Sequence, residues 1–152
     1  GNQGDYAEVG EAMEELVGDV SRQLEALFRR VVFSIGVHNT DDHLRNHGFL
    51  RRSSRWGLSP LFDVNPNPSL SRSRATAVYG ETGDAETKGA CDLAYAFGIS
   101  MVRARAVVKD VLAAVSKWRQ TARRNGCQEN ELALFNAMFA DRTRALAEAF
   151  RM

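Results

Sequence analysis

The sequence predicts a mainly α-helical domain that carries one small β-hairpin. Apolar residues recur at helical spacing up to Gly36 and again beyond residue 90, whereas residues 47–59 hold two short strand-like pieces around a polar tip. The 152 residues, 44% of them hydrophobic and 26% charged, suffice for one ordinary domain, which we assign to residues 1–152. This composition excludes disordered and collagen-like chains, and no apolar run approaches the length of a membrane span.

Two helices are predicted in the first 36 residues. The first covers residues 5–17 and ends at Gly18. The second begins after Asp19, a residue type that often caps helix N-termini, and its pattern loosens at Gly36. The apolar positions that recur along the second helix are Leu24, Leu27, Phe28, Val31, Val32 and Ile35.

A dense polar run from His38 to His43 follows this apolar helix directly. After it, residues 47–50 and 56–59 are predicted to pair as a hairpin. The arginine- and serine-rich residues 51–55 form the tip, where we expect a solvated face. Two prolines within residues 65–68 then impose an extended, non-helical course.

The second half of the chain is predicted to be helical again. Residues 69–89 are rich in Ser, Thr and Gly, and we place one strand at residues 75–79. A helix at residues 90–97 ends at Gly98, and a long helix capped by Ser100 is stopped by Gly126. Its inward positions are expected to be Val102, Val107, Val108, Val111, Leu112, Val115 and Trp118. A final helical region holds Leu132, Phe135, Met138, Phe139, Leu146 and Phe150.

Charge is unevenly distributed along the chain, although the net charge is only +1. Residues 1–28 hold seven acidic residues and one arginine, and residues 29–74 hold eight arginines and three aspartates. The basic segment either handles an anion or pairs with the acidic one. The pattern is not that of a nucleic-acid-binding domain, so no direct nucleic-acid contact is expected. Cys91 and Cys127 lack CxxC pairing, and the N-terminus lacks a signal peptide, which indicates a reducing, cytoplasmic setting without membrane contact.

The polar run contains the residue types that phosphoryl transfer requires. Asp41 and Asn46 lie five residues apart, and Asp63 follows the hairpin. In protein kinases the catalytic-loop Asp and Asn have this separation, and a metal-binding Asp comes later. Carboxylate and amide oxygens suit Mg²⁺. By itself an acidic pair after a helix is usually structural, and a metal-dependent phosphoesterase would need more His and Asp ligands than this chain offers. For His38 and His47 we expect places in the core, since neither has a partner at metal-ligand spacing.

Two stretches of the chain carry a distinctive pattern, namely Ser34-Ile35-Gly36 with the run Asn39-Thr40-Asp41-Asp42-His43-Leu44-Arg45-Asn46, and Leu58-Ser59-Pro60-Leu61-Phe62-Asp63. They resemble the C-terminal region of HipA-like serine/threonine kinases. Residues 41–46 also resemble, more distantly, the D-x-H-x-x-N catalytic loop of phosphatidylinositol-kinase-like enzymes. The specific likeness covers residues 19–68 and continues more loosely to about residue 140.

The resemblance implies a protein-kinase-like C-terminal lobe, helical, with a small hairpin that carries the metal site. It implies that Asp41 is the catalytic carboxylate, and that Asn46 and Asp63 bind Mg²⁺ and thereby the cofactor ATP. Arg45 is expected to contact a phosphate, and His43 to order the loop by hydrogen bonding. The resemblance further implies a bacterial toxin–antitoxin setting, a protein substrate phosphorylated on Ser or Thr, and a DNA-binding antitoxin as a partner.

The nucleotide-gripping half of a kinase has no counterpart in this sequence. The 12 glycines never fall in G-x-G order, and all three lysines, beginning with Lys88, follow Asp41. In HipA-like kinases that apparatus lies N-terminal to the segment seen here, and the start at Gly1 suggests a fragment or a truncated gene product. We therefore expect a toxin-kinase lobe that is inactive alone and needs an N-terminal kinase lobe as partner. The alternative is a stand-alone or pseudokinase binding module that docks a partner protein or a separate N-lobe.

Overall fold

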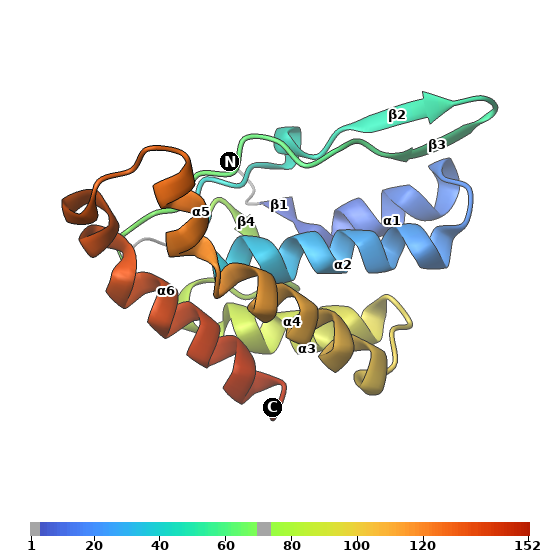
Figure 1. Ribbon diagram of the computed structural model, residues 1–152. Helices are drawn as coiled ribbons and strands as arrows, with labels where there is room; N and C mark the ends of the chain where they lie inside the picture. Colours follow the sequence, from blue (N-terminus) through green and yellow to red (C-terminus); the bar gives the residue numbers. More distant parts are fainter. Residues whose placement is uncertain (1–3, 70–73) are drawn as a thin grey trace.

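The computed structural model describes residues 4–69 and 74–152. Figure 1 shows a bundle of helices with the β2–β3 hairpin running along one side. This arrangement confirms the prediction of a mainly helical fold with a small hairpin. In chain order the elements are β1 (Gly4–Asp5), α1 (Tyr6–Leu16), α2 (Val20–Gly36), β2 (Phe49–Arg52), β3 (Arg55–Leu58), β4 (Thr76–Ala77), α3 (Glu86–Ala96), α4 (Met101–Val115), α5 (Trp118–Arg124) and α6 (Glu129–Ala149), with 3-10 turns at Leu44–Asn46 and Gly83–Ala85.

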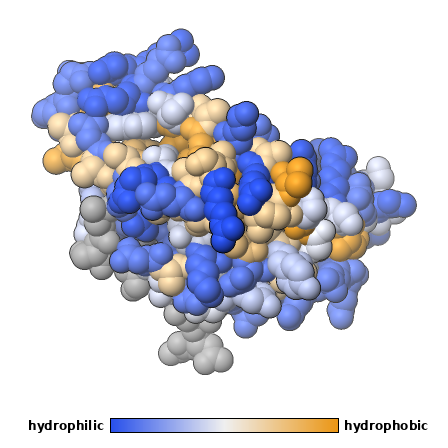
Figure 2. Space-filling view, turned by 90° about the horizontal axis from the view of Figure 1, so that it is seen from below, coloured by the Kyte–Doolittle hydropathy of each residue, from blue (hydrophilic) through white to orange (hydrophobic). Residues whose placement is uncertain are grey.

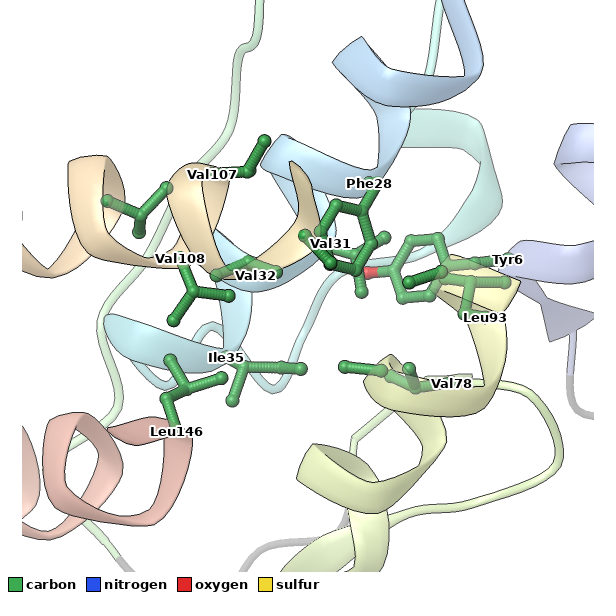
Figure 3. Packing of buried hydrophobic residues seen from close by; sticks show 14 of the residues in the cluster. Tyr6, Phe28, Val31, Val32, Ile35, Val78, Leu93, Val107, Val108 and Leu146 are labelled. Carbon is green, nitrogen blue, oxygen red and sulfur yellow. The ribbon is translucent and has the colours of Figure 1, made fainter. Parts of the chain in front are cut away.

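Helix α2 lies at the centre of the bundle, in contact with α1, α3, α4 and α6. The six apolar positions predicted along it are all buried, as their helical spacing requires. Figure 3 shows several of them meeting side chains from the surrounding elements, namely Tyr6, Val78, Leu93, Val107, Val108 and Leu146. The surface is polar in contrast to this apolar core. Figure 2 shows the molecule from below, where hydrophilic residues cover most of the face and surround smaller hydrophobic areas.

The helix starts show which capping predictions are correct. Ser100 caps α4, since its side chain accepts a hydrogen bond from the Arg103 N–H at 3.2 Å. Asp19 immediately precedes α2 as predicted, but it adopts a φ of 55° and its side chain makes no capping hydrogen bond. The carboxylate that caps in this region is Asp5, which accepts from the Ala7 N–H at 2.8 Å at the start of α1.

Two helix boundaries differ from the predictions. The long helix predicted between Ser100 and Gly126 is divided into α4 and α5 at residues 116–117. Trp118 is the first residue of α5 and stacks on Phe139 of α6, with ring centroids 4.4 Å apart. This tertiary contact accompanies the break in the predicted helix. Val102, which was predicted to face inward, is 80% exposed. Helix α3 begins at Glu86 rather than at residue 90, because Glu86 is buried and bound by two arginines described below.

The strands are two separate pairs. The antiparallel β2–β3 hairpin extends from the Phe49–Leu58 pair to the Arg52–Arg55 pair, so its strands include arginines that were expected in the tip. Strand β4 falls within the predicted residues 75–79, but it pairs in parallel with β1, a contact between distant segments that no local pattern predicts. Two short ranges lie outside the described residues. Residues 1–3 belong to the start of the expected domain, and residues 70–73 belong to the segment 69–89.

Both cysteines are free thiols, as predicted. Over residues 4–69 and 74–152, no helix combines the length and apolar character needed to cross a bilayer.

Candidate functional site

The polar run leaves the C-terminal end of α2 as a tight loop. The Asn39 N–H donates to the Ser34 carbonyl at 2.8 Å, and His38 adopts a φ of 53° to make the turn. A 3-10 turn then closes the loop, with the Asn46 N–H donating to the His43 carbonyl at 2.8 Å. The loop therefore sits between the end of the central helix and the hairpin, and its side chains point either inward or outward.

Asp41 and Arg45 lie on the outward side. The Asp41 side chain is 75% exposed, and its Oδ1 lies 3.1 Å from His43 Nε2. His43 is thus the side chain that contacts the Asp41 carboxylate, and its role in ordering the loop stays a prediction. Within the described part of the chain, no hydrogen bond or ion pair joins Asp41 to Asn46 or Asp63, and Arg45 forms no ion pair.

Asn46 and Asp63 meet, although the hairpin separates them in the sequence. Asn46 Nδ2 donates to Asp63 Oδ2 at 3.2 Å, and Asn65 Nδ2 donates to Asp63 Oδ1 at 2.9 Å. The Asn65 N–H is held in turn by Asn39 Oδ1 at 3.3 Å. Asp63 has a φ of 55°, a left-handed conformation that Asp tolerates better than most residues. We call the set Asp41, His43, Arg45, Asn46 and Asp63 the outer site.

Asp42, the neighbour of Asp41, points into the core. Its Oδ2 accepts hydrogen bonds from the Tyr6 hydroxyl and from Ser34 Oγ, the latter at 2.9 Å. Its Oδ1 lies 3.1 Å from His47 Nε2, and its side chain is only 5% exposed. Of the two aspartates, Asp42 therefore has the structural role that an acidic pair after a helix usually has.

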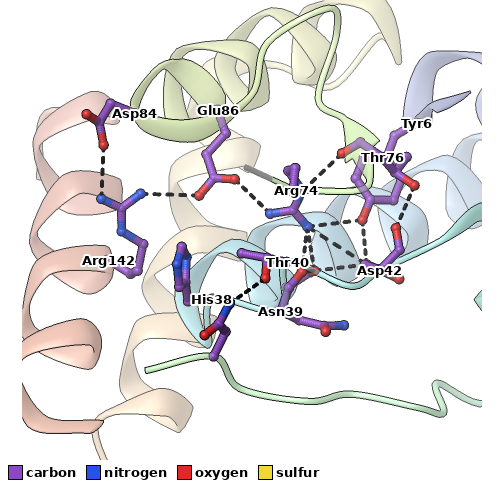
Figure 4. A network of polar contacts seen from close by, with 12 residues as sticks. Tyr6, His38, Asn39, Thr40, Asp42, Arg74, Thr76, Asp84, Glu86 and Arg142 are labelled. Carbon is purple, nitrogen blue, oxygen red and sulfur yellow. Dashed lines mark hydrogen bonds and ion pairs between the residues drawn. The ribbon is translucent and has the colours of Figure 1, made fainter. Parts of the chain in front are cut away.

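The buried cation opposite Asp42 is Arg74. Figure 4 shows its guanidinium among side chains from several elements. It donates to Ser34 Oγ at 2.7 Å, to Tyr6 Oη at 3.2 Å and to Glu86 Oε2 at 2.8 Å. Glu86 also accepts from Arg142 Nη1 at 3.3 Å, which ties α6 to α3. We call the set Tyr6, Ser34, Asp42, His47, Arg74, Glu86 and Arg142 the buried network.

Sequence reasoning missed the buried network as such. Ser34 was noted only for the family likeness, Tyr6 was not singled out, and Arg74 and Glu86 lie in the segment 69–89, for which only one strand was predicted. The partners of Arg74 are 68 residues away at Tyr6 and 40 residues away at Ser34, so no spacing along the chain marks them. The one local signal is His47, five residues after Asp42, which the sequence analysis assigned to the core.

Burial and hydrogen bonding together set the ionisation of the buried network. Burial alone would raise the pKa of Asp42, but hydrogen bonds from His47, Tyr6 and Ser34 outweigh it and hold the pKa below its ordinary value. Burial raises the pKa of the Tyr6 phenol far above its ordinary value, although the charge of Arg74 opposes the rise. Burial likewise opposes the charge on Arg74, yet contacts with Tyr6 and Glu86 raise its pKa. At neutral pH, Asp42 and Arg74 are therefore charged and Tyr6 is protonated.

The outer site contains the residues that fit a magnesium ion. His38 and His47 are buried as expected, and among the described residues no group of three or more His, Cys, Asp or Glu side chains is arranged to hold a metal. The remaining candidates are Asn46 and Asp63, whose side chains are in contact through Asn46 Nδ2, and turning the Asn46 amide over would present its oxygen on that side instead. Mg²⁺ commonly takes one or two protein carboxylate or amide oxygens and completes its shell with water and substrate phosphates. Because Asp63 is exposed, a phosphate-bearing ligand can reach this pair.

Comparison with known protein families decides the assignment of the chain. The model of the HipA-like C-terminal domain matches residues 1–119, which include the complete outer site. The chain belongs to the HipA-like C-terminal domain family. No curated protein matches the sequence. Membership in the HipA-like family confirms the resemblance and supports a toxin–antitoxin and kinase-like context.

Proposed function

We propose that this HipA-like lobe supplies the catalytic carboxylate and the magnesium ligands for ATP-dependent phosphorylation of Ser or Thr residues on a protein. The observation that carries the proposal is the contact between Asn46 and Asp63 at 3.2 Å, formed by the same loop that exposes Asp41. An amide in contact with a carboxylate, on a loop that also carries an exposed carboxylate, supports this proposal because phosphoryl transfer depends on positioning and on neutralisation of phosphate charge.

Each residue of the outer site has a distinct part in the proposal. The Asp41 carboxylate orients the acceptor hydroxyl and takes its proton, and the contact with His43 holds that carboxylate in place. Arg45 lies exposed in the same loop and contacts a phosphate of the nucleotide. Asn46 and Asp63 are the residues that would hold Mg²⁺, which would supply positive charge to offset that of the ATP phosphates.

The proposal includes partners beyond the chain itself. A kinase also grips the triphosphate with a glycine-rich loop and a lysine, which the sequence does not contain before Asp41. We therefore propose that the lobe works in the cytoplasm with an N-terminal kinase lobe, phosphorylates a protein substrate, and is controlled by a DNA-binding antitoxin.

The metal assignment is tested without measuring activity. Trace Mn²⁺, used as a paramagnetic substitute for Mg²⁺, is titrated into the ¹⁵N-labelled chain. We expect selective broadening of the amide resonances near Asn46 and Asp63, reversal by excess Mg²⁺, and affinity reduced about tenfold or more by Asp63→Asn. The matched control is Asp110→Asn on α4, which removes an exposed carboxylate paired with Arg29 and is expected to change nothing. Broadening elsewhere, or broadening that survives Asp63→Asn, contradicts the assignment and favours the binding-module alternative.

The activity part of the proposal has a separate test. The 152-residue chain alone, incubated with Mg²⁺, radiolabelled ATP and a mixture of protein substrates, is expected to transfer no phosphate. Clear transfer that Asp41→Ala abolishes would show that the lobe is complete as it stands. In a longer protein that joins the lobe to a nucleotide-binding half, Asp41→Ala is expected to abolish phosphorylation.

A further inference from the structure

A polar pocket lies between the hairpin and helix α2, and none of the outer-site residues lines it. It has a volume of about 610 Å³ and is formed by the α1–α2 turn, the exposed side of α2 and the hairpin. Figure 1 shows the hairpin running alongside these helices, and strand β3 contacts both α1 and α2. The side chains that give the pocket its chemistry are Arg22, Arg30, Arg52, Arg55, Leu50 and Trp56. Neither the family match nor the proposed function assigns a role to it.

The pocket has a strong excess of positive charge. Four arginines line it, against the single carboxylate of Asp19, and none of the four forms an ion pair with any described residue. Several other arginines of this chain find carboxylates: Arg29 pairs with Asp110 at 3.3 Å, and Arg103 pairs with Glu25 at 2.6 Å. The pocket therefore gathers in one place four guanidinium groups that no carboxylate of the described residues neutralises.

Arg30 is the most constrained of these cations. Its Nη2 donates to the Ser59 carbonyl, which fixes the guanidinium at the pocket wall. Its Nη1 is buried and has no hydrogen-bond partner among the residues that the structure describes. A buried charged donor that lacks a partner costs free energy, and a nearby anion would offset part of that cost through its charge. The desolvation of this guanidinium also lowers its pKa.

The surroundings of the pocket limit the shape of an anionic ligand. Helix α1, next to strand β3, carries the exposed glutamates Glu8, Glu11, Glu14 and Glu15, and none of them forms an ion pair in the described part of the chain. A nucleic-acid strand needs a continuous positive track along its backbone, and these carboxylates would repel it beyond the pocket. A compact anion with two charges avoids this repulsion.

Apolar surface borders the cationic centre. Leu50 is 46% exposed and Trp56 is 43% exposed, both beside the arginines. Arginine forks bind phosphate oxygens in a bidentate manner, and an exposed indole offers a flat face to an apolar group or a ring. We propose that this pocket binds a phosphate monoester, with the phosphate held by Arg22, Arg30, Arg52 and Arg55 and its carrier lying against Leu50 and Trp56.

The proposal is tested by direct binding to the full chain. The probe is a short fluorescein-labelled peptide with one phosphoserine between leucines, measured by fluorescence anisotropy at low salt. Arg52→Gln and Arg55→Gln are exposed changes that the fold tolerates, and each is expected to weaken binding about tenfold, with a larger loss for the pair. Arg124→Gln, which removes an exposed arginine from α5 outside the pocket, is the matched control and is expected to leave binding unchanged.

Competitors identify the source of the phosphate and can overturn the proposal. Displacement by the unlabelled phosphopeptide but not by adenosine monophosphate supports a phosphorylated protein segment, and the reverse supports a free nucleotide. In both cases Asp63→Asn must leave binding intact, which separates this pocket from the outer site. The proposal is overturned if the unphosphorylated peptide binds as tightly, if single-stranded DNA binds more tightly than either phosphate monoester, if the Arg52→Gln and Arg55→Gln variants bind like the control, or if no probe binds.

Discussion

Asp41 and Asp42 have the same side chain and adjacent positions, but one carboxylate is 75% exposed and the other is 5% exposed. Every oxygen of Asp42 is engaged by a side chain of the core, whereas the contact of Asp41 is with the half-exposed His43. The buried network thus uses its charges to hold the loop against α2 and α3, and the outer site keeps its charges available for a ligand. The difference teaches that two adjacent residues of a polar run can serve as a buried anchor and as an exposed carboxylate.

The largest effect should follow from removing the cation of the buried network. Arg74→Met leaves the buried carboxylates of Glu86 and Asp42 without their main counter-charge, so we expect a loss of about 3–5 kcal/mol in the free energy of unfolding. Urea denaturation measures it. Arg29→Met is the control, because the exposed Arg29–Asp110 pair should contribute about 1 kcal/mol or less. Equal losses in the two variants would show that the buried network does not anchor the fold.

The next prediction separates the two aspartates directly. Asp42→Asn keeps the shape of the side chain but removes the charge that accepts from Tyr6 and Ser34, so we expect a loss of about 1–3 kcal/mol. Asp41→Asn, at an exposed position, should change the free energy of unfolding by about 0.5 kcal/mol or less. A larger effect at Asp41 than at Asp42 would contradict the assignment of Asp42 as the anchor.

The pH dependence of stability sharpens the same comparison. The folded-state pKa of Asp42 lies below its ordinary value, so the unfolded chain binds more protons there, and stability falls as the pH drops through the folded-state pKa. The stabilisation from the Asp42 carboxylate is fully present above about pH 4. Between its ordinary pKa and its folded-state pKa, the free energy of unfolding falls by up to about 1.4 kcal/mol per pH unit. Urea denaturation measured at a series of pH values from 7 downward should therefore show that the free energy of unfolding of Asp42→Asn depends less on pH, at acidic pH, than that of the wild type. The same dependence on acidic pH in both proteins would contradict the prediction.

The smallest effect is expected at Asp63. Asn tolerates the left-handed φ of 55° at this position, so Asp63→Asn should change stability by about 0.5 kcal/mol or less while it removes the charge proposed to bind Mg²⁺. Asp63→Val, with a β-branched side chain in the same conformation, should cost about 1–2 kcal/mol. Circular dichroism melts of the two variants measure the contrast. A destabilised Asp63→Asn would mean that this carboxylate anchors the loop as Asp42 does.

Much of the helical framework could be predicted from the sequence, because its signals are local. The spacing of apolar residues along α2 marked its buried face, and Ser100 and Gly98 marked the turn before α4. Predictions failed where distant contacts compete with local patterns. Trp118 stacks on Phe139 and divides a predicted helix, and Glu86 is drawn into the core by two arginines, which starts α3 earlier.

The sequence by itself determined the family likeness, and it predicted that Asn46 and Asp63 meet. Asn46 lies on a short loop, and Asp63 follows a hairpin whose register returns the chain to that loop, where the two side chains are in contact. Only the tertiary structure decided which aspartate faces inward, which arginine neutralises it, and which arginines gather beside the hairpin. The physical reason is that a buried charge is stable only where partners from distant segments converge, and that convergence depends on packing rather than on sequence spacing.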